Sequence, residues 1–549
     1  MNGLRRSITC CLAILASLSL SAQKQTEKED IPHLERRGYV TQLIVDHRPF
    51  LMLAGELHNS SSSSLEYMKP EWRELAKMGL NTVLTPISWE LVEPTEGKYD
   101  FSLVDGLLAQ AREQHLHIVF LWLAAWKNGM SGYPPVWVKE DLRRFPRAME
   151  DGNPTPILSS FSPALREEDS RAFNALMEHI RIVDAQDHTV LMMQVENEVG
   201  VLGASRDHSQ VADQAFASHV PTELMRYLVD HRESLNQELR VLWELNGAKS
   251  EGTWTEVFGD SARADEIFMA WQYARYVQAV AAAGKRAYAI PMYANAWLGG
   301  GDTPPGNYPS GGPQPRVLDV WKAAGTALDM QSPDLYAADF GDWCSRYNRP
   351  DNPLFIPETN SGSAGAANVF YAVGEQSALG FSPFGIDSGL RGDDSPNAQI
   401  AARSRAELGS SYEILAELMP ELASAQVQGK VHGFVLDKGH PAADFVLDGV
   451  SVHIRLDEIF GHQAENGYGL ILEEQLNTFL GAGKGFRVSF TPRDSDVSRI
   501  GLASVVEGHF ELGVWVAGRH LNGDEDDQGN AWRFDQRQVH IERATIYHY

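Results

Sequence analysis

Short apolar runs alternate with amphipathic stretches of helical period over most of the first 390 residues. Each apolar run is typical of a buried strand and ends in polar residues. The strands that we expect are residues 50–58, 81–90, 117–123, 190–198, 287–295, 335–340, 353–358 and 380–387. Alternation of strand and helix is the pattern of a parallel sheet. Eight such strands predict a closed (β/α)8 barrel, an α/β fold.

Three further stretches complete the organisation of the chain. Residues 23–38 are polar and predict a lead-in, and residues 200–285 predict a mostly helical insertion between the fourth and fifth strands. After Pro420 the pattern changes to short alternating runs between Gly, Asp and Asn turns, which is typical of a β-sandwich. We therefore expect a catalytic barrel over residues 23–422 and a C-terminal β-sandwich over residues 423–549.

The first 22 residues have the pattern of a secretory signal peptide. Arg5 and Arg6 precede an apolar run over residues 8–20 that ends in small residues, and this run is too short to span a membrane. The interpretation predicts an exported protein, periplasmic or secreted. Of three cysteines only Cys344 would then remain, so no internal disulfide could form.

The net charge of the chain limits the kinds of molecule that it would bind. The formal net charge of −26 argues against nucleic acid or an anionic membrane surface as a partner. It fits a neutral or cationic ligand, and it indicates no oligomeric state.

Two carboxylates end two different predicted strands. Glu198 ends the fourth strand with Asn197 beside it, and Glu358 ends the seventh. In a barrel of this kind the loops after the strands build the active site, so we expect both carboxylates at one rim. A protonated carboxyl facing an ionised one is what glycosidic-bond cleavage needs. Mutual repulsion raises the pKa of one carboxyl group of such a pair, so that one group stays protonated while the other is ionised.

The motifs around these carboxylates resemble glycoside hydrolase family 35, a β-galactosidase family. The matching stretches are Ala-Gly-Glu-Leu-His at 54–58, Trp89 followed by Glu93-Pro94 and Gly97, and Gln-Val-Glu-Asn-Glu at 194–198. The resemblance covers roughly residues 39–387. It implies that Glu198 is the acid/base, that Asn197 binds the sugar 2-hydroxyl and that Glu358 is the nucleophile. The implied reaction retains the anomeric configuration, with the two carboxylates about 5–5.5 Å apart.

The sequence departs from the family where members grip the sugar. Asn59-Ser60-Ser61 follows His58 where members carry Tyr-x-Arg, and Pro86 stands where a Tyr is usual. After the third strand, Ala-Ala-Trp at 124–126 replaces Ala-Glu-Trp. We therefore expect a divergent branch with galactose as the favoured sugar, acting on side chains of plant polysaccharides such as xyloglucan.

Other polar and aromatic residues at the expected rim are candidates for substrate contact, each with packing or support of a neighbour as the alternative. They are Trp126, Lys127, Asn128, Tyr336, Asn295 and Glu56. The clan implies a Tyr that holds the nucleophile, and Tyr336 is a candidate for that role. Glu196 shares a strand face with Glu198 one layer deeper, which favours a structural carboxylate beneath the site.

We expect neither a metal ion nor a cofactor. His115 and His117 begin their strand and so fall at the opposite end of the barrel from the active-site rim, without companion ligands. The acidic stretch 524–529 lacks the flanking helices of a calcium loop and favours a solvated turn.

These observations predict a metal-independent, retaining exo-β-galactosidase with a carbohydrate substrate. Two alternatives stay open. The first is another retaining exo-glycosidase, acting on β-glucosides or α-L-arabinosides. The second is a non-catalytic carbohydrate-binding barrel, against which the presence of both Glu198 and Glu358 counts.

Overall fold

The computed structural model describes residues 31–390, 396–447, 449–459, 461–493 and 499–549. The expected signal peptide, residues 1–22, lies outside the described residues.

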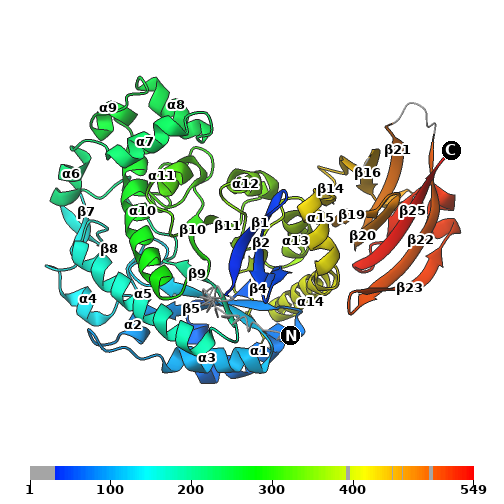
Figure 1. Cartoon of the computed structure of the whole chain (residues 1–549), viewed down its shortest axis with the longest axis horizontal. Coiled ribbons are helices and arrows are strands. Elements are labelled where there is room, and N and C mark those ends of the chain that lie inside the picture. Colours follow the sequence, from blue (N-terminus) through cyan, green and yellow to red (C-terminus); the bar gives the residue numbers. More distant parts are fainter. Residues whose placement is uncertain (1–30, 391–395, 448, 460, 494–498) are drawn as a thin grey trace, which may run out of the picture. The chain divides into compact units, whose positions relative to one another are not determined.

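Eight parallel strands close into a barrel in the order of the sequence, which confirms the predicted (β/α)8 fold (Figure 1). Almost every strand residue is buried, because helices cover the outside and side chains fill the inside. The barrel strands are β4 (Met52–Glu56), β5 (Thr82–Ser88), β6 (His117–Leu123), β9 (Val190–Val195), β10 (Met292–Trp297), β11 (Met330–Leu335), β12 (Ile356–Thr359) and β13 (Gly380–Pro383). Pairing of Gly380 in β13 with Met52 in β4 closes the ring.

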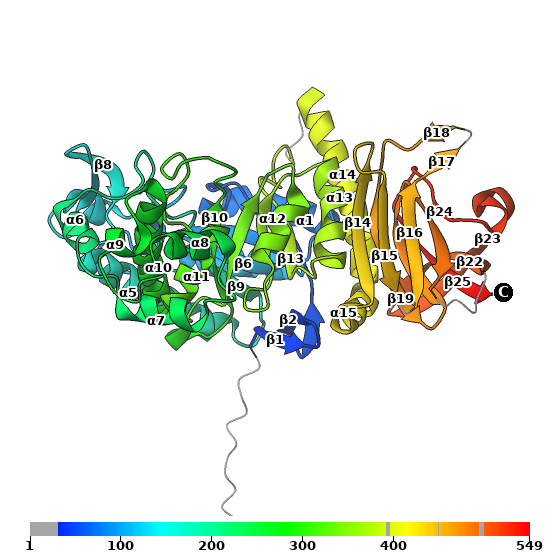
Figure 2. The ribbon, with the colours of Figure 1, turned by 90° about the horizontal axis from the view of Figure 1, so that it is seen from above.

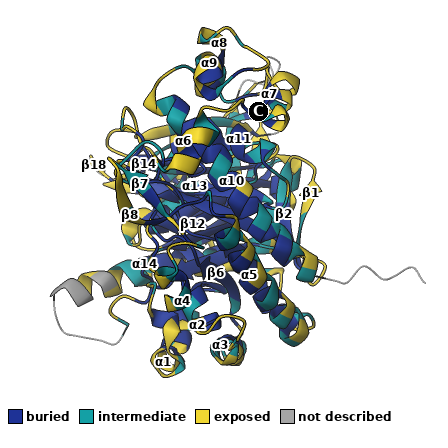
Figure 3. Ribbon diagram, turned by 90° about the vertical axis from the view of Figure 1, so that its left-hand side faces the viewer, coloured by how far each residue is buried: buried dark blue, intermediate teal, exposed yellow. Residues whose placement is uncertain are grey.

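Two long helices show how the outer layer forms. Helix α5 (Pro163–Asp184) begins after Ser162, whose side chain accepts a hydrogen bond from the backbone of Leu165, and proline occupies its first turn. Helix α10 (Ala262–Ala287) packs against it, where Gly284 lies against the Phe173 ring. Figure 3 shows buried strands inside and exposed residues on the outer helix faces. The other helices around the barrel are α1 (Leu65–Lys77), α2 (Trp89–Val92), α3 (Ser102–Glu113), α4 (Val136–Glu140), α11 (Leu318–Ala323), α12 (Phe340–Tyr347) and α13 (Ser363–Gly374).

The expected positions of the fifth and sixth strands are wrong. Ala287 ends helix α10, and strand β10 begins five residues later at Met292. Strand β11 ends at Leu335, where the sequence predicted a strand to begin, and Phe340 begins helix α12. Pro333 explains the second error, because a proline in an otherwise strand-like run argues against a central strand. Here Pro333 pairs with Ala296 inside the barrel.

The predicted helical insertion lies between β9 and β10 and is confirmed. It consists of short helices before the long helix α10: α6 (Gln210–Phe216), α7 (Thr222–Asp230), α8 (Gln237–Leu245) and α9 (Trp254–Phe258). A hairpin of β7 (Arg147–Glu150) and β8 (Asn153–Leu158) interrupts the chain before α5.

The prediction of a polar lead-in over residues 23–38 is wrong for its last residues. Residues 33–37 form strand β1 (His33–Arg37), which pairs with β2 (Val40–Val45) and through it with β3 (Arg48–Phe50). Leu43 and Val45 of β2 share a buried cluster with interior barrel residues such as Leu84. This small sheet therefore covers apolar side chains of the barrel interior.

The C-terminal segment is a β-sandwich, as the alternating pattern predicted (Figure 2). Helices α14 (Pro396–Glu417) and α15 (Met419–Gln428) precede it, so the expected boundary at residues 422/423 falls inside a helix. One sheet has the order β14 (Val431–Asp437), β19 (Asn466–Gln475), β20 (Thr478–Lys484), β25 (His540–His548), β22 (Ile500–Glu511), β23 (Val514–Leu521). The other has the order β15 (Ala442–Leu447), β16 (Val450–Leu456), β21 (Phe486–Pro492), β24 (Trp532–Phe534).

Successive residues of β19 belong to two different apolar cores, which shows what each face of the larger sheet packs against. Ile471 joins the core between the sheets, whereas Leu470 and Leu472 join the core that continues into the barrel. The same sheet thus packs against the smaller sheet on one side and against α13 on the other.

Candidate active site

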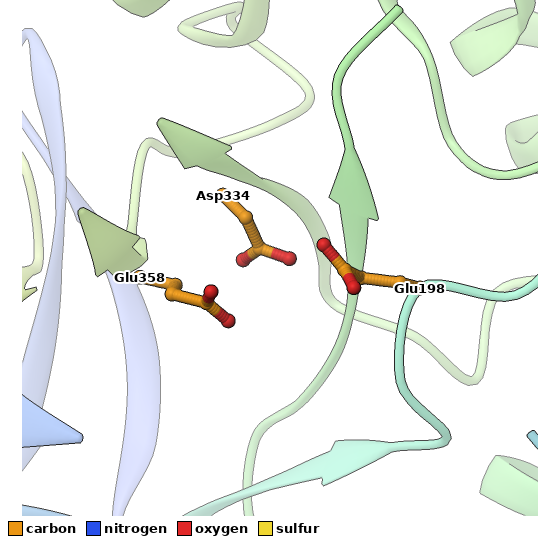
Figure 4. A group of neighbouring side chains, drawn as sticks. All are labelled: Glu198, Asp334 and Glu358. Atoms are coloured by element: carbon orange, nitrogen blue, oxygen red, sulfur yellow. The ribbon is translucent and has the colours of Figure 1, made fainter. Parts of the chain in front are cut away.

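Three carboxylates from three strands converge at the C-terminal rim of the barrel. Glu198 follows β9, Asp334 lies in β11 and Glu358 lies in β12. One carboxylate oxygen from each residue lies within 4.8 Å of the others, and all three side chains are buried (Figure 4). The structure therefore brings together the predicted pair, Glu198 and Glu358, and adds a third acid between them.

Neighbouring strands fix the position of Glu198. Its backbone N–H donates to Oδ1 of Asn295 at 2.9 Å, and Nδ2 of Asn295 donates to Asp334 at 2.7 Å. The Asn128 amide donates to the Glu198 carboxylate. Glu198 is only 4% exposed and has a φ of +45°, a conformation uncommon outside glycine. Asn295 and Asn128, expected to contact substrate, both hold the acid itself.

A tight turn after β6 positions Asn128 beside Glu198. Residues 127 and 130 exchange backbone hydrogen bonds of 2.8 and 2.9 Å. The two residues between them, Asn128 and Gly129, have φ values of +51° and +67°. Asn-Gly is the preferred pair for such a two-residue turn, so this dipeptide was a signal in the sequence for the geometry.

Glu358 is held by Tyr336. The tyrosine hydroxyl donates to Oε1 of Glu358 at 2.5 Å. Burial and the nearby Glu358 charge both raise the pKa of Tyr336, so the hydroxyl keeps its proton and remains a donor. The other oxygen of Glu358 has no hydrogen-bond partner among the described side chains and backbone. That oxygen is free to meet a reacting group.

Electrostatics separates the acids of the cluster. Burial raises the pKa of Glu198 to about 7; Lys127 opposes this shift and Glu358 adds to it. Burial and the charges of Glu358 and Glu198 hold the pKa of Asp334 well above its usual range. Near neutral pH the cluster therefore keeps protons on carboxyl groups, and a carboxyl that titrates at about 7 is poised for general acid and base work.

Sequence reasoning missed Asp334. The predicted sixth strand, residues 335–340, left Asp334 just outside it, although Asp334 pairs with Glu358 of β12 in the barrel register. The signal was present: a run with Asp at its polar end, followed two residues later by Tyr336.

Glu56 and Lys127 lie at the same rim and are both buried. Burial and the Glu358 charge raise the pKa of Glu56 well above its usual range. Burial would lower the pKa of Lys127, but Glu198, Glu358 and other nearby carboxylates outweigh burial and raise it. Within the described part of the chain, Lys127 forms no ion pair as close as 4 Å and no side-chain hydrogen bond. Its ammonium is therefore available to a ligand.

Asn197 offers a second unused group. Both its amide oxygen and its amide nitrogen are buried without a hydrogen-bond partner among the described residues. Leaving such a group unpaired costs free energy, about 1–3 kcal/mol for a neutral donor or acceptor. A substrate hydroxyl would satisfy it.

Trp126 does not line the site, which corrects the expected substrate contact. Its indole is fully buried, donates to the Leu158 carbonyl at 3.0 Å and packs edge-on against Tyr273 and Tyr276. The adjacent backbone explains why: the N–H groups of Ala125 and Trp126 donate to the Glu196 carboxylate at 3.0 and 2.9 Å and turn the side chain outward into the helix layer. Glu196 thus supports the loop beneath the site.

The histidines singled out in the sequence stay away from the rim. The ring of His117 hydrogen-bonds the His188 carbonyl at 2.9 Å, at the start of β6. Over the described residues, the rim carboxylates are the group with metal-ligand spacing, and Lys127 adds positive charge to that same group. No described helix combines the length and apolarity that crossing a bilayer requires.

Comparison with known families gives matches for two parts of the chain. Residues 59–262 match the model of glycoside hydrolase family 42, described as beta-galactosidase. This part of the barrel is therefore similar to β-galactosidase-like glycoside hydrolases. Residues 408–533 match a domain of unknown function, DUF5597. The predicted likeness to β-galactosidases is confirmed for this part of the chain, whereas membership of family 35 stays a prediction.

Two curated proteins and one solved structure show partial similarity to the chain. The chain is 29% identical to a beta-galactosidase of Xanthomonas manihotis over 38% of its own length and 33% of the relative's. It is 25% identical to beta-galactosidase 14 of Arabidopsis thaliana, over 34% of this chain and 20% of that protein. The crystal structure of a Bacillus circulans beta-galactosidase shares 15% identity over 68% of this chain and 57% of that chain, with a TM-score of 0.46. The matched region thus spans a third or less of the two curated relatives.

Proposed function

We propose that the chain is a retaining exo-β-galactosidase that hydrolyses terminal β-D-galactosyl residues from oligosaccharides or polysaccharide side chains. The observation that carries the proposal is that one carboxylate oxygen of Glu198 and one of Glu358 lie within 4.8 Å of each other at the C-terminal rim of the barrel. A retaining pair lies about 5–5.5 Å apart, whereas an inverting pair needs about 6.5–9.5 Å to admit a water molecule. The names of the matched family and relatives support galactose as the sugar.

The geometry supports a two-step displacement. In the first step Glu358 attacks the anomeric carbon through its free oxygen, and Glu198 gives its proton to the departing oxygen. In the second step Glu198, now ionised, takes a proton from water. The water oxygen attacks the same carbon and releases Glu358. A pKa of about 7 suits a group that must act first as acid and then as base.

Two other groups complete the proposal. Tyr336 holds Glu358 in line through its 2.5 Å hydrogen bond, and Asn197 binds the sugar 2-hydroxyl with its unpaired amide. Xyloglucan side chains remain the proposed natural source of the galactosyl group, and export through residues 1–22 would place the enzyme where such polymers occur.

A panel of nitrophenyl glycosides tests the proposal, with wild type beside Glu198→Gln, Glu358→Gln and the surface control Glu113→Gln. We expect the β-galactoside to be preferred and the first-formed sugar, observed by NMR, to be the β anomer. Glu358→Gln should lose at least about 10⁴-fold in kcat, as when a covalent nucleophile is removed. Glu198→Gln should lose about 10²–10⁴-fold, and less on leaving groups that need no proton.

A fluorosugar inhibitor gives an independent check. A 2-deoxy-2-fluoro-β-galactoside should label Glu358 covalently, and peptide mass spectrometry would locate the adduct. An α anomer as first product would exclude retention. If a β-glucoside or an α-L-arabinoside is preferred, the proposed mechanism stands and the proposed sugar is wrong. Neither labelling nor turnover with any glycoside would favour a binding protein.

A further inference from the structure

A second cavity opens beside the catalytic carboxylates. It has a volume of about 470 Å³ and lies over the ends of β10 and β11. Its lining includes Trp297, Gly300, Asp334, Tyr336, Asp339 and Arg346. Asp334 and Tyr336 belong to both places, so the cavity is continuous with the reaction centre.

Two aromatic rings of this cavity are exposed. Trp297 is 40% exposed and Tyr336 is 44% exposed, although large aromatic side chains are mostly buried elsewhere in the barrel. An exposed apolar patch at the mouth of a site marks a binding surface. A flat ring that presents one apolar face fits the C–H face of a pyranose, and polar groups at its edge fix the orientation.

The backbone under Trp297 is held rigidly. The buried Gln314 side chain donates to the Trp297 carbonyl at 2.7 Å and accepts from the Gly299 N–H at 3.0 Å. Arg316 also donates to the Gly299 carbonyl at 3.2 Å. A ring on a fixed backbone loses little conformational freedom when a ligand binds, which favours affinity.

Two charged side chains, Arg346 and Asp339, line the same cavity as the two aromatic rings. Arg346 lies over the Trp343 ring at 4.8 Å, and neither Arg346 nor Asp339 forms an ion pair with any described residue. A guanidinium and a carboxylate that are not engaged in ion pairs can bind sugar hydroxyls.

The arrangement of the rim indicates which part of a substrate enters. On one side of the rim, Glu56 lies on β4 and Lys127 lies after β6, and both side chains are buried. Over β10 and β11 lies the cavity, with the exposed rings of Trp297 and Tyr336. Glu198, the proposed acid, follows β9, which is hydrogen-bonded to β10. An acid must lie against the oxygen that leaves, so the leaving group departs toward β10.

We propose that the cavity lined by Trp297 is an aglycone subsite that binds a second pyranose ring, so that the enzyme prefers galactosyl-oligosaccharides over simple galactosides. This inference rests on the proposed function. It assigns Trp297 as the residue that sets the preference for the leaving group.

The test compares two disaccharides with a substrate that has no aglycone ring. The probes are β-galactosyl-(1→4)-glucose, β-galactosyl-(1→2)-xylose and β-galactosyl fluoride. The variants are Trp297→Ala, Trp297→Phe and Tyr39→Ala, an exposed aromatic on the turn between β1 and β2. We expect Trp297→Ala to lower the ratio of kcat/KM for the better disaccharide to kcat/KM for the fluoride at least about tenfold, because the contact between the indole and the aglycone ring is lost. Trp297→Phe should restore most of the ratio, and Tyr39→Ala should match wild type.

Binding to the Glu358→Gln protein provides a second readout. In calorimetry, adding Trp297→Ala should weaken the binding of the disaccharide more than the binding of free galactose. An unchanged ratio in both experiments, or cleavage of the fluoride with neither disaccharide accepted, would overturn the subsite. If wild type does not cleave even the fluoride, the proposed function itself fails, which is a different result from a failure of the subsite alone.

Discussion

Lys127 places a buried ammonium beside Glu56, Glu198, Asp334 and Glu358. Four acids in one buried cluster repel each other, and burial disfavours their charged forms. The positive charge of Lys127 opposes both effects, and it lowers the pKa of Glu198 toward its value of about 7. Its charge therefore lowers the pH at which the proposed acid loses its proton, against the larger opposite effect of burial.

We expect kcat/KM for a glycoside with a poor leaving group to fall above about pH 7, because Glu198 must carry its proton to act. Lys127→Met removes a charge that favours ionised Glu198, so the pKa of Glu198 should rise. The alkaline limb of the profile should then move to higher pH. A pH series of kcat/KM with both proteins measures the shift.

Lys127→Arg is the matched control, since it keeps the charge. Its alkaline limb should stay near that of wild type even if its rate is lower. A limb that moves to lower pH in Lys127→Met would contradict the assignment of the limb to Glu198.

At the scale of elements, helix α13 meets strand β14 backbone to backbone. A Cβ added at Gly433 would lie 2.1 Å from the Phe370 carbonyl oxygen, and one added at Gly374 would lie 2.8 Å from Gly433 Cα. The two glycines therefore allow the sandwich to approach the barrel layer. No side chain fits between the two backbones.

Gly433→Ala should destabilise the protein by about 1–3 kcal/mol, because the helix or the strand must shift to admit the methyl group. Thermal unfolding should show a fall in Tm of several degrees. The control is Gly132→Ala, at an exposed glycine with no atom within 4 Å of the added Cβ. Equal Tm values for the two variants would show that the contact tolerates a side chain.

The sequence predicted the elements well where burial was continuous and poorly where polar residues lie inside a strand. The run ending at Glu198 and the run ending at Glu358 are apolar, so both carboxylates were placed on strands. Strand β11 contains Ser332, Pro333 and Asp334, which look like a turn, and so Asp334 was missed. Hydrogen bonds such as that between Asn295 and Glu198 join residues 97 positions apart, and no local pattern reveals them.

At the scale of the molecule, the barrel and the sandwich share one apolar core. Tyr468, Leu470 and Leu480 of the larger sheet belong to the same buried cluster as residues of the barrel. Polar links accompany it: Lys484 pairs with Glu407 at 2.8 Å, and Gln426 donates to the Val373 carbonyl at 2.8 Å. Separating the two parts would expose apolar surface on both.

We therefore expect barrel and sandwich to unfold together, although the chain is long enough for independent domains. Calorimetry should give one transition, and Gly433→Ala should move it as a whole. Two resolved transitions, with only one displaced by that substitution, would contradict a shared core.

The helical insertion between β9 and β10 divides the barrel into two sets of four strands. The turn after α8 is exposed, and Gly247 there has open space around it. A chain interrupted at this turn would leave Glu198 in one fragment and both Asp334 and Glu358 in the other. Neither fragment alone would hold a catalytic pair, so glycoside turnover would report when two such halves, fused to separate proteins, come together.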